Sequence, residues 1–154
     1  GLTQTTTREL SKAMKLKSGG MYYYFNSKDA LIIACAEEAV IRVENSLFVP
    51  ALKELPQPKE MMEHLQINAL EIAPTMRFFV SVCTDMRYAE GMRPVLERVG
   101  KRYTQYATRF AKALNTDTKE ITPFVFMMIT AISNYMVFGE ASLVSPQLKA
   151  VQII

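Results

Sequence analysis

Apolar side chains recur along this chain at intervals of three and four residues, the spacing that places them on one face of a helix. No segment alternates apolar and polar residues in the manner of a half-buried strand. The pattern therefore predicts an all-α fold. It predicts helices over about residues 6–14, 18–24, 28–48, 58–73, 75–89, 94–114 and 118–141, and a further one that begins at Ser145-Pro146.

Capping signals mark where two of these helices begin. Thr6 and Glu9 have the spacing of a capping box, in which the threonine hydroxyl caps the helix and the glutamate reaches back to the threonine. Ser27 is placed to cap the helix over 28–48, with Asp29 in its first turn, where the helix dipole favours an anion.

Prolines predict breaks in the later helices. Pro74 is expected to end the helix over 58–73, because proline lacks the backbone donor that the next turn needs. Pro123 leaves two possibilities, which are a kink in the helix over 118–141 or a restart with Thr122 as its cap.

The composition is that of a folded chain, with 154 residues and 49% hydrophobic side chains. The nearest candidate for a membrane span, Phe124 to Phe138, is interrupted by polar residues, so we expect no span. The sequence also lacks a signal peptide with a basic start and an apolar middle. Cys35 and Cys83 lie in apolar helical patterns without metal-like spacing, and we expect buried, reduced thiols in a cytoplasmic protein.

Positive charge is concentrated at the start of the chain. The net charge is +3, but residues 1–28 carry five basic side chains and one acidic one, whereas the remainder carries 13 basic and 14 acidic. Such a local field suits phosphate groups, and a solvated helix face has the same composition. Charge alone leaves both interpretations open.

The predicted second helix carries an unusual run of tyrosines. Met21 and Phe25 are four residues apart and are expected to pack inward together. Tyr22, Tyr23 and Tyr24 then point in three other directions, so they cannot all be core residues. With the neighbouring lysines they place hydroxyls, aromatic faces and positive charge on one small convex surface. Such a surface suits a DNA groove.

Signals for catalysis or metal binding are weak. Ser18-Gly19-Gly20 precedes a predicted helix but lacks the preceding strand and the Gly-Lys-Ser/Thr ending of a phosphate-binding loop. His64 is the only histidine, and no Cys-x-x-Cys pair accompanies it. The carboxylates of Asp85–Glu90 fit the polar face of one helix better than an acid–base pair. We therefore expect no enzyme, no catalytic residue, no metal site and no cofactor.

Methionine and aromatic side chains are abundant between residues 61 and 136, mainly at helical core spacing. They suit either a core with a dimer interface or an adaptable effector pocket, because methionine repacks around varied shapes. The residues that we assign to such a pocket are Met62, Phe78, Phe79, Val82, Met86, Tyr103, Phe110 and Phe126. A buried Glu71, Asp85 or Glu140 in its wall would select a cation.

A longer N-terminal motif combines Thr6-Thr7, Leu10, the run Gly19–Phe25, Lys28 and Leu31. It resembles the DNA-binding module of the tetracycline-repressor (TetR) family of transcriptional regulators. The resemblance covers about residues 1–40 and implies a three-helix, helix-turn-helix domain over 1–47, with 6–14 as its second helix and 18–24 as its recognition helix. The first helix of that domain would be missing from the chain. We therefore expect a somewhat longer protein.

The resemblance also implies which residues meet DNA, namely Thr7, Arg8, Lys17, Ser18, Gly20, Tyr22, Tyr23, Tyr24 and Lys28. Thr7, Tyr24 and Lys28 resemble phosphate contacts. Arg8 resembles a residue that reaches a guanine edge, where a bidentate contact contributes about 1–3 kcal/mol of discrimination.

The remaining members of this set belong to the recognition helix. Lys17, Ser18 and Gly20 occupy its front, which meets base edges in this docking geometry. Tyr22 resembles a contact to a base or a thymine methyl group, and Tyr23 fits either a DNA contact or packing against the module.

Two residues depart from the family pattern. Lys15 stands in the turn where glycine is usual, so a left-handed conformation there would be strained. Gly20 replaces a side chain that often reads a base, so specificity at that position must come from DNA shape or be weak.

For the rest of the chain the resemblance implies a ligand-binding and dimerisation domain over 48–154. Two subunits would pair through residues 118–154 or so, and twofold pairing predicts a palindromic operator. An effector between the helices of 58–141 would reposition the helix over 28–48 and release the DNA, which describes a repressor. The alternative is a helical ligand-binding protein or enzyme with a vestigial helix-turn-helix.

Overall fold

The computed structural model describes residues 6–13, 15, 17, 20–50 and 58–139. These ranges contain no strand, and the predicted all-α fold is confirmed. The helices are α1 (Thr7–Ala13), α2 (Met21–Tyr24), α3 (Lys28–Val43), the π-helix η1 (Glu44–Phe48), α5 (Pro58–Cys83), the 3₁₀-helix η2 (Met86–Tyr88), α6 (Ala89–Leu114) and α7 (Thr118–Phe138).

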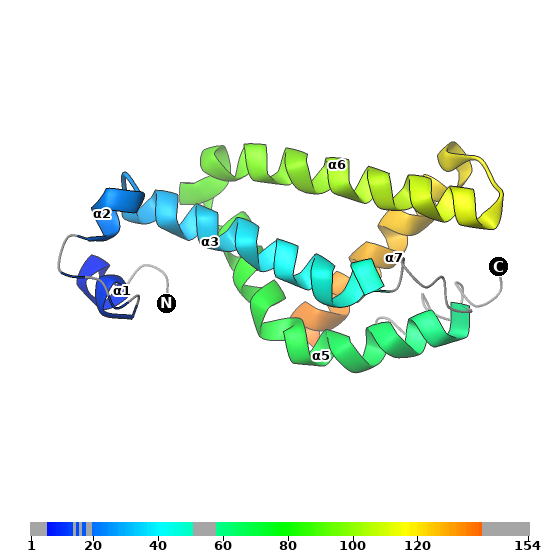
Figure 1. Ribbon diagram of the computed structural model, residues 1–154, viewed down its shortest axis with the longest axis horizontal. Coiled ribbons are helices and arrows are strands. Elements are labelled where there is room, and N and C mark those ends of the chain that lie inside the picture. The colour runs from blue at the N-terminus through cyan, green and yellow to red at the C-terminus, as the bar shows by residue number, and fades with distance from the viewer. Residues whose placement is uncertain (1–5, 14, 16, 18–19, 51–57, 140–154) are drawn as a thin grey trace.

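The N-terminal helices stand apart from the rest of the molecule. α1 and α2 lie together at one end, and α3 runs from them into a bundle with α5, α6 and α7 (Figure 1). Within the bundle α3 packs against α5 and α6, and α7 packs against the same two helices. The small N-terminal pair is therefore joined to the bundle through α3.

One hydrophobic core runs through α3, η1, α5, α6 and α7. Val40 of α3, Leu47 of η1, Val82 of α5 and Met136 of α7 are all fully buried in it. The α3 side chains in this core fall at helical spacing: Ile32, Ala36, Ala39, Val40 and Val43. The helix that bears the N-terminal pair is thus also a structural part of the bundle.

Two helix starts occur as the sequence predicts. The Glu9 N–H donates to Thr6 Oγ1 at 3.2 Å, and the Thr6 N–H donates to Glu9 Oε2 at 2.7 Å, which completes the capping box. The Ala30 N–H donates to Ser27 Oγ at 3.0 Å at the start of α3. These side-chain oxygens accept from backbone N–H groups that have no intrahelical partner at the start of a helix.

The predicted break at Pro74 is wrong, because α5 continues through this residue to Cys83. Pro74 lies on the exposed side of the helix, where water hydrates the carbonyl that loses its partner. The cost of an internal proline is therefore reduced. α5 changes direction along its length in Figure 1, as an internal proline leads us to expect.

Pro123 does not restart a helix either. It lies inside α7, whose start is capped by the Asp117 carboxylate, which accepts from the Lys119 N–H at 2.7 Å. The Thr122 hydroxyl donates to the Thr118 carbonyl at 2.6 Å, so Thr122 is an interior residue and not a cap.

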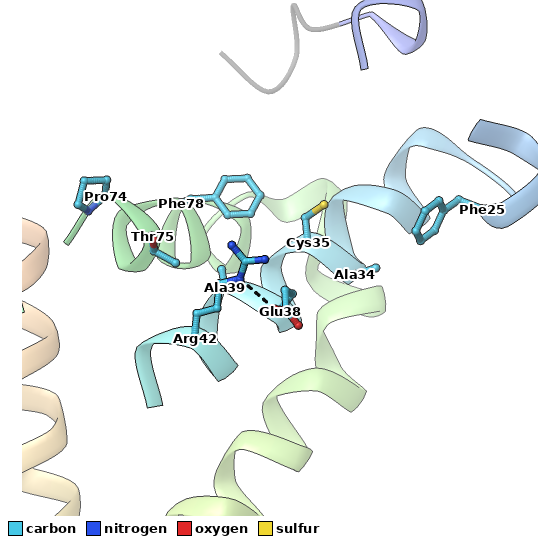
Figure 2. Close-up of a pocket in the computed structure, with 9 residues that line it drawn as sticks. All are labelled: Phe25, Ala34, Cys35, Glu38, Ala39, Arg42, Pro74, Thr75 and Phe78. Carbon is cyan, nitrogen blue, oxygen red and sulfur yellow. Dashed lines mark hydrogen bonds and ion pairs between the residues drawn. The ribbon is translucent and has the colours of Figure 1, made fainter. Parts of the chain in front are cut away.

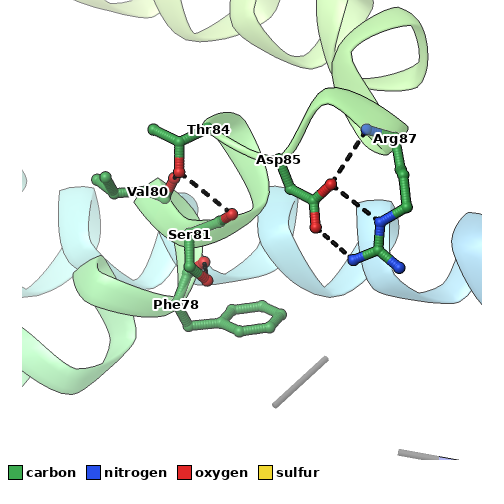
Figure 3. A network of polar contacts seen from close by, with 6 residues as sticks. All are labelled: Phe78, Val80, Ser81, Thr84, Asp85 and Arg87. Atoms are coloured by element: carbon green, nitrogen blue, oxygen red, sulfur yellow. Dashed lines mark hydrogen bonds and ion pairs between the residues drawn. The ribbon is translucent and has the colours of Figure 1, made fainter. Parts of the chain in front are cut away.

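A tight corner joins α5 to α6, as Figure 3 shows. The Thr84 hydroxyl donates to the Val80 carbonyl at 2.9 Å and closes the end of α5. The Asp85 carboxylate accepts from the Arg87 N–H at 3.1 Å and forms an ion pair with the Arg87 guanidinium. This guanidinium lies 5.2 Å from the centre of the buried Tyr88 ring. The corner replaces the end of the helix predicted over 75–89, and α6 begins earlier than predicted.

Left-handed residues end the last two helices. Asn115 follows α6 with a φ of 53°, and Gly139 follows α7 with a φ of 68°. α6 therefore ends where the sequence predicts, whereas α7 ends before the predicted residue 141. The helix predicted from Ser145-Pro146 lies outside the described residues.

Gly91 and Gly100 of α6 provide a test of how closely this helix approaches α3. A β-carbon at Gly91 would lie 2.3 Å from Ile33 Cδ1, whereas one at Gly100 would meet nothing within 4 Å. Gly100→Ala should raise the free energy of unfolding by about 1 kcal/mol, because alanine is the better helix former. Gly91→Ala should gain less or lose stability, because Ile33 must move. Urea unfolding measures both changes, and equal gains would contradict the close approach.

Within the described ranges, α7 alone has the length and composition to cross a membrane. The core helix of a soluble bundle passes the same test. α7 supplies core side chains from Ile121 to Met136, packed against α5 and α6. One face of α7 therefore forms part of the core of this bundle.

Candidate nucleic-acid interface

Three tyrosines form an exposed surface on α2. Tyr22 is 55% exposed, Tyr23 86% and Tyr24 66%. The rings of Tyr23 and Tyr24 meet edge to face with 5.0 Å between their centroids. The turn before them is closed by a hydrogen bond from the Tyr23 N–H to the Gly20 carbonyl at 3.3 Å. The phenol groups therefore face solvent and are accessible to a partner.

Basic and hydroxyl side chains lie on the segments next to these tyrosines. α1 packs against α2 and begins at Thr7, with Arg8 exposed beside it. Lys17 is exposed between the two helices, and Lys28 begins α3 shortly after α2. Ser18 lies outside the described residues. The fold thus gathers these predicted contact residues at the end of the molecule that carries the tyrosines.

Phe25 lies behind this surface. It is half-buried and lines a groove between α3 and α5, where it contributes to the junction of the N-terminal pair with the bundle. The side chain of Met21, which was predicted to pack inward with it, lies outside the described part of the chain.

Lys15 adopts a left-handed backbone conformation with a φ of 56°, as its place in the turn predicts. Lys15→Gly should raise the free energy of unfolding of the N-terminal pair by about 1 kcal/mol, because glycine carries no penalty in this conformation. Native-state hydrogen exchange of the α1 amides measures the change. Lys12→Gly, inside α1, is the matched control and should lower the same free energy by about 1 kcal/mol. If both variants changed this free energy in the same direction, the backbone strain inferred at Lys15 would be refuted.

Two ion pairs tie α3 and η1 to α6. Arg98 donates to both carboxylate oxygens of Glu37, at 2.6 and 2.7 Å, on the exposed side. Its hydrogen bond lowers the pKa of the Glu37 carboxyl below the usual range. One turn along α6, Arg102 Nε donates to Glu44 Oε2 at 2.6 Å, where the Glu44 side chain is 3% exposed. These pairs fix the register of α3 and η1 against α6.

Aromatic side chains surround the inner pair. The Tyr106 hydroxyl donates to Glu44 Oε2 at 3.3 Å, and the rings of Phe48, Tyr103 and Tyr106 lie 6.2 to 6.4 Å apart between centroids. The Phe126 ring lies 6.0 Å from that of Tyr103. Burial, together with the Glu44 charge, raises the pKa of Tyr106 to about 12 and also raises the pKa of Tyr103. Both phenols therefore stay protonated at neutral pH.

The N-terminal segment matches a known family. Residues 1–35 match the family model described as "Bacterial regulatory proteins, tetR family". Residues 1–35 therefore carry a TetR-type DNA-binding module, which supports a DNA-binding transcription regulator. The match covers α1, α2 with its tyrosines and the start of α3, and the family implies operator DNA and a dimer. No curated protein and no solved structure matches the chain.

The side chains predicted to line an effector pocket lie in different environments. Phe79 and Val82 are buried in the core, and Tyr103 and Phe110 are half-buried against it. Phe126 is partly exposed on α7. Five of the eight predicted residues are thus in or against the bundle core, because Phe78 also packs against it.

Phe78 packs against the core and also lines a groove, whereas Met86 lies apart from the core. Phe78 lines the groove of about 580 Å³ between α3 and α5, with Phe25 and Cys35, as Figure 2 shows. Met86 is 85% exposed on η2. The side chain of Met62 lies outside the described part of the chain.

The two described acidic residues proposed for the pocket wall are not buried in the bundle. Glu71 is exposed, Asp85 pairs with Arg87 at the corner after α5, and Glu140 lies outside the described residues. Among the acidic residues that the structure describes, the buried one is Glu44, which is 2% exposed and had no predicted role.

A signal for Glu44 was present in the sequence. It lies four residues after Val40 and three before Leu47, so helical spacing places it on the apolar face of its helix. A charged residue on such a face needs a partner when buried. Nothing in the sequence identified that partner as Arg102.

The cysteines differ from expectation in part. Cys35 is exposed, so its predicted burial is wrong, whereas Cys83 is half-buried, and both are free thiols. Burial raises the pKa of Cys83. Asn68 contacts the ring of His64 at 3.2 Å. Over the described ranges, no group of His, Cys, Asp and Glu side chains is arranged to hold a metal ion.

Proposed function

We propose that this protein is a cytoplasmic repressor that binds a palindromic operator as a homodimer and leaves it when a small-molecule effector binds. The observation that carries the proposal is the exposed tyrosine surface of α2, at the end of α3. Exposed aromatic rings beside basic side chains mark an interaction surface for a charged partner with apolar edges, and a DNA groove is such a partner.

We assign the DNA contacts to Thr7, Arg8, Lys17, Ser18, Gly20, Tyr22, Tyr23, Tyr24 and Lys28. In this assignment the lysines neutralise phosphates and set affinity, and Arg8 and Tyr22 read base edges. The roles follow from the TetR-type module and from the exposure of Arg8, Lys17 and the three tyrosines.

α7 supplies a surface that suits dimerisation. Phe126, Met127 and Phe138 are exposed on it and share one side of the helix with Thr130 and Asn134. We propose that this side, together with the residues up to 154, pairs two copies as a four-helix bundle. Twofold pairing would place two recognition helices about 34–36 Å apart, or some multiple of that distance.

The double variant Met127→Glu, Phe138→Glu should convert the dimer to a monomer, because twofold symmetry would bury each new charge in both subunits. Sedimentation velocity measures the mass. Met86→Glu is the matched control, since Met86 is also an exposed methionine but lies on η2. It should leave the dimer intact. A double variant that still sediments as a dimer would exclude this side of α7 as the interface.

The proposed release mechanism uses α3. This helix belongs to the proposed DNA-binding domain, 1–47, and its inner face packs in the core of the proposed effector and dimerisation domain, 48–154. An effector that favours a shifted α3 would change the separation of the recognition helices. Moving the population from 1:99 to 99:1 requires about 5.5 kcal/mol of differential affinity.

Fluorescence anisotropy with duplexes from the DNA that flanks the coding sequence tests the proposal. We expect saturable, salt-dependent binding to a palindromic site with two subunits per duplex. If no flanking duplex binds more tightly than a scrambled one, the proposal fails. The alternative, a helical ligand-binding protein or enzyme with a vestigial helix-turn-helix, would then be favoured.

A further inference from the structure

Glu44 is a buried carboxylate with an unused hydrogen-bonding atom. Its Oε2 accepts from Arg102 Nε at 2.6 Å and from the Tyr106 hydroxyl at 3.3 Å. Its Oε1 is also buried and has no hydrogen-bond partner in the part of the chain that the structure describes. Buried polar atoms in native proteins are nearly always paired, so the exception calls for an explanation.

Arg102 has the complementary feature on the other side of the same ion pair. Its Nη2 is buried and lacks a hydrogen-bond partner among the described residues. The pair with Glu44 is electrically balanced, so it leaves one acceptor and one donor unused but no net charge. A charged ligand would upset this balance in a buried place, whereas a neutral ligand with one donor and one acceptor would complete it.

The surroundings favour a flat ligand with an apolar body. The rings of Phe48, Tyr103 and Phe126 lie next to one another, with 6.3 Å between the first two centroids and 6.0 Å between the last two. Pockets for small molecules combine such rings with a few polar groups that orient the ligand. The Arg102 side chain is 25% exposed and Phe126 is 36% exposed, so the pair lies close beneath the surface of the bundle.

The backbone at Glu44 also changes its winding. α3 ends at Val43, and the chain continues as the π-helix η1 from Glu44 to Phe48. π-helical turns are rare and occur frequently at functional sites. The unpaired carboxylate oxygen of Glu44 therefore lies where the regular α-helix of α3 gives way to the π-helix η1.

We propose that Glu44 and Arg102 form a binding site for a neutral, planar ligand with an adjacent hydrogen-bond donor and acceptor, as in a primary aromatic amide. The ligand N–H donates to Glu44 Oε1, its carbonyl oxygen accepts from Arg102 Nη2, and its ring packs against Tyr103 and Phe126. That this ligand acts as the effector rests on the proposed function. α3 connects the two sites, because it begins next to the tyrosine surface and ends at this carboxylate.

A set of three probes of nearly equal size tests the site. Benzamide offers both a donor and an acceptor, acetophenone offers only the acceptor, and benzamidine is a cation that offers only donors. Isothermal titration should give a Kd of about 1 mM or lower for benzamide, as expected for a ligand of this size. The other two probes should bind at least about fivefold more weakly, because each leaves one buried atom unpaired. Equal binding of all three, or no binding of benzamide, overturns the inference.

Two nearly isosteric variants locate the probe. Glu44→Gln places an amide NH₂ or a rearranged carbonyl where Oε1 accepts, and it should weaken benzamide binding about tenfold or more. Tyr106→Phe is the matched control, because it removes a hydrogen bond to Oε2 but leaves both unused atoms in place. It should change the Kd by less than about threefold. Unchanged benzamide binding in Glu44→Gln overturns the inference. If that variant does not fold, the comparison of the three probes in the unsubstituted protein decides whether the ligand site exists.

Operator binding distinguishes this inference from the proposed function. If the protein binds a flanking palindrome but benzamide does not bind, only the ligand site is wrong. If benzamide binds with the expected selectivity but no flanking DNA binds, the ligand site stands and the proposed function fails.

Discussion

Tyr22→Ala is expected to weaken binding to operator DNA by about 30-fold or more while leaving the free energy of unfolding unchanged within about 0.5 kcal/mol. Tyr22 is 55% exposed, so its removal costs little packing. A base contact contributes about 1–3 kcal/mol, and a symmetric dimer loses the contact twice. Fluorescence anisotropy on the palindromic duplex measures the affinity, and urea unfolding measures the stability.

Three further variants make this result specific. Tyr22→Phe separates the ring from the hydroxyl and should retain binding if the ring packs on a thymine methyl group. Lys28→Ala should weaken binding to all sequences alike and reduce the slope of log affinity against log salt by about 2 per dimer. Lys101→Ala, an exposed lysine on α6, should change neither quantity. Full binding by both Tyr22→Ala and Lys28→Ala would contradict the proposed interface.

Arg102→Leu is expected to lower the free energy of unfolding by about 3 kcal/mol. Breaking a buried ion pair leaves the other charge uncompensated, and the Glu44 side chain is only 3% exposed. The Arg102 side chain is 25% exposed, which keeps the expected loss at the lower end of the range for buried pairs. For a chain of this size the melting temperature should fall by about 6–12 °C.

The outer ion pair supplies the matched control. Arg98→Leu breaks a bidentate contact from α6 to Glu37 of α3, but the side chains are 49% and 27% exposed. It should lower the free energy of unfolding by less than about 1 kcal/mol. The double variant Glu44→Leu, Arg102→Leu should recover most of the loss, because two apolar side chains replace the pair. A double variant as unstable as Arg102→Leu alone would show that the loss comes from packing and not from the stranded charge.

Features that depend on near neighbours in the chain were predictable. The capping box of Thr6 and Glu9 and the cap at Ser27 involve residues three positions apart, and both form as predicted. Lys15 takes the left-handed conformation that its place in the turn requires. The outward direction of the tyrosines followed from the same reasoning, because helical spacing cannot bury three consecutive side chains.

Features that depend on distant partners were not predictable. Glu44 and Arg102 are 58 positions apart, and the sequence contains no information on the register of α3 against α6. The prediction at Pro74 failed for a related reason. A proline interrupts a helix when its freed carbonyl is buried, and the exposure of that side of α5 depends on which other helices pack against it.

The dual membership of α3 has a practical consequence for engineering chimaeras. Its buried side chains from Ile32 to Val43 pack in the core of this bundle, so the helix fits one particular set of neighbours. A chimaera that joined residues 1–47 to the ligand-binding domain of another regulator would place the apolar face of α3 against helices that do not fit it. A junction placed immediately before Lys28 would transfer the residues proposed to read base edges. The host protein would keep its own counterpart of α3, packed against its own neighbours.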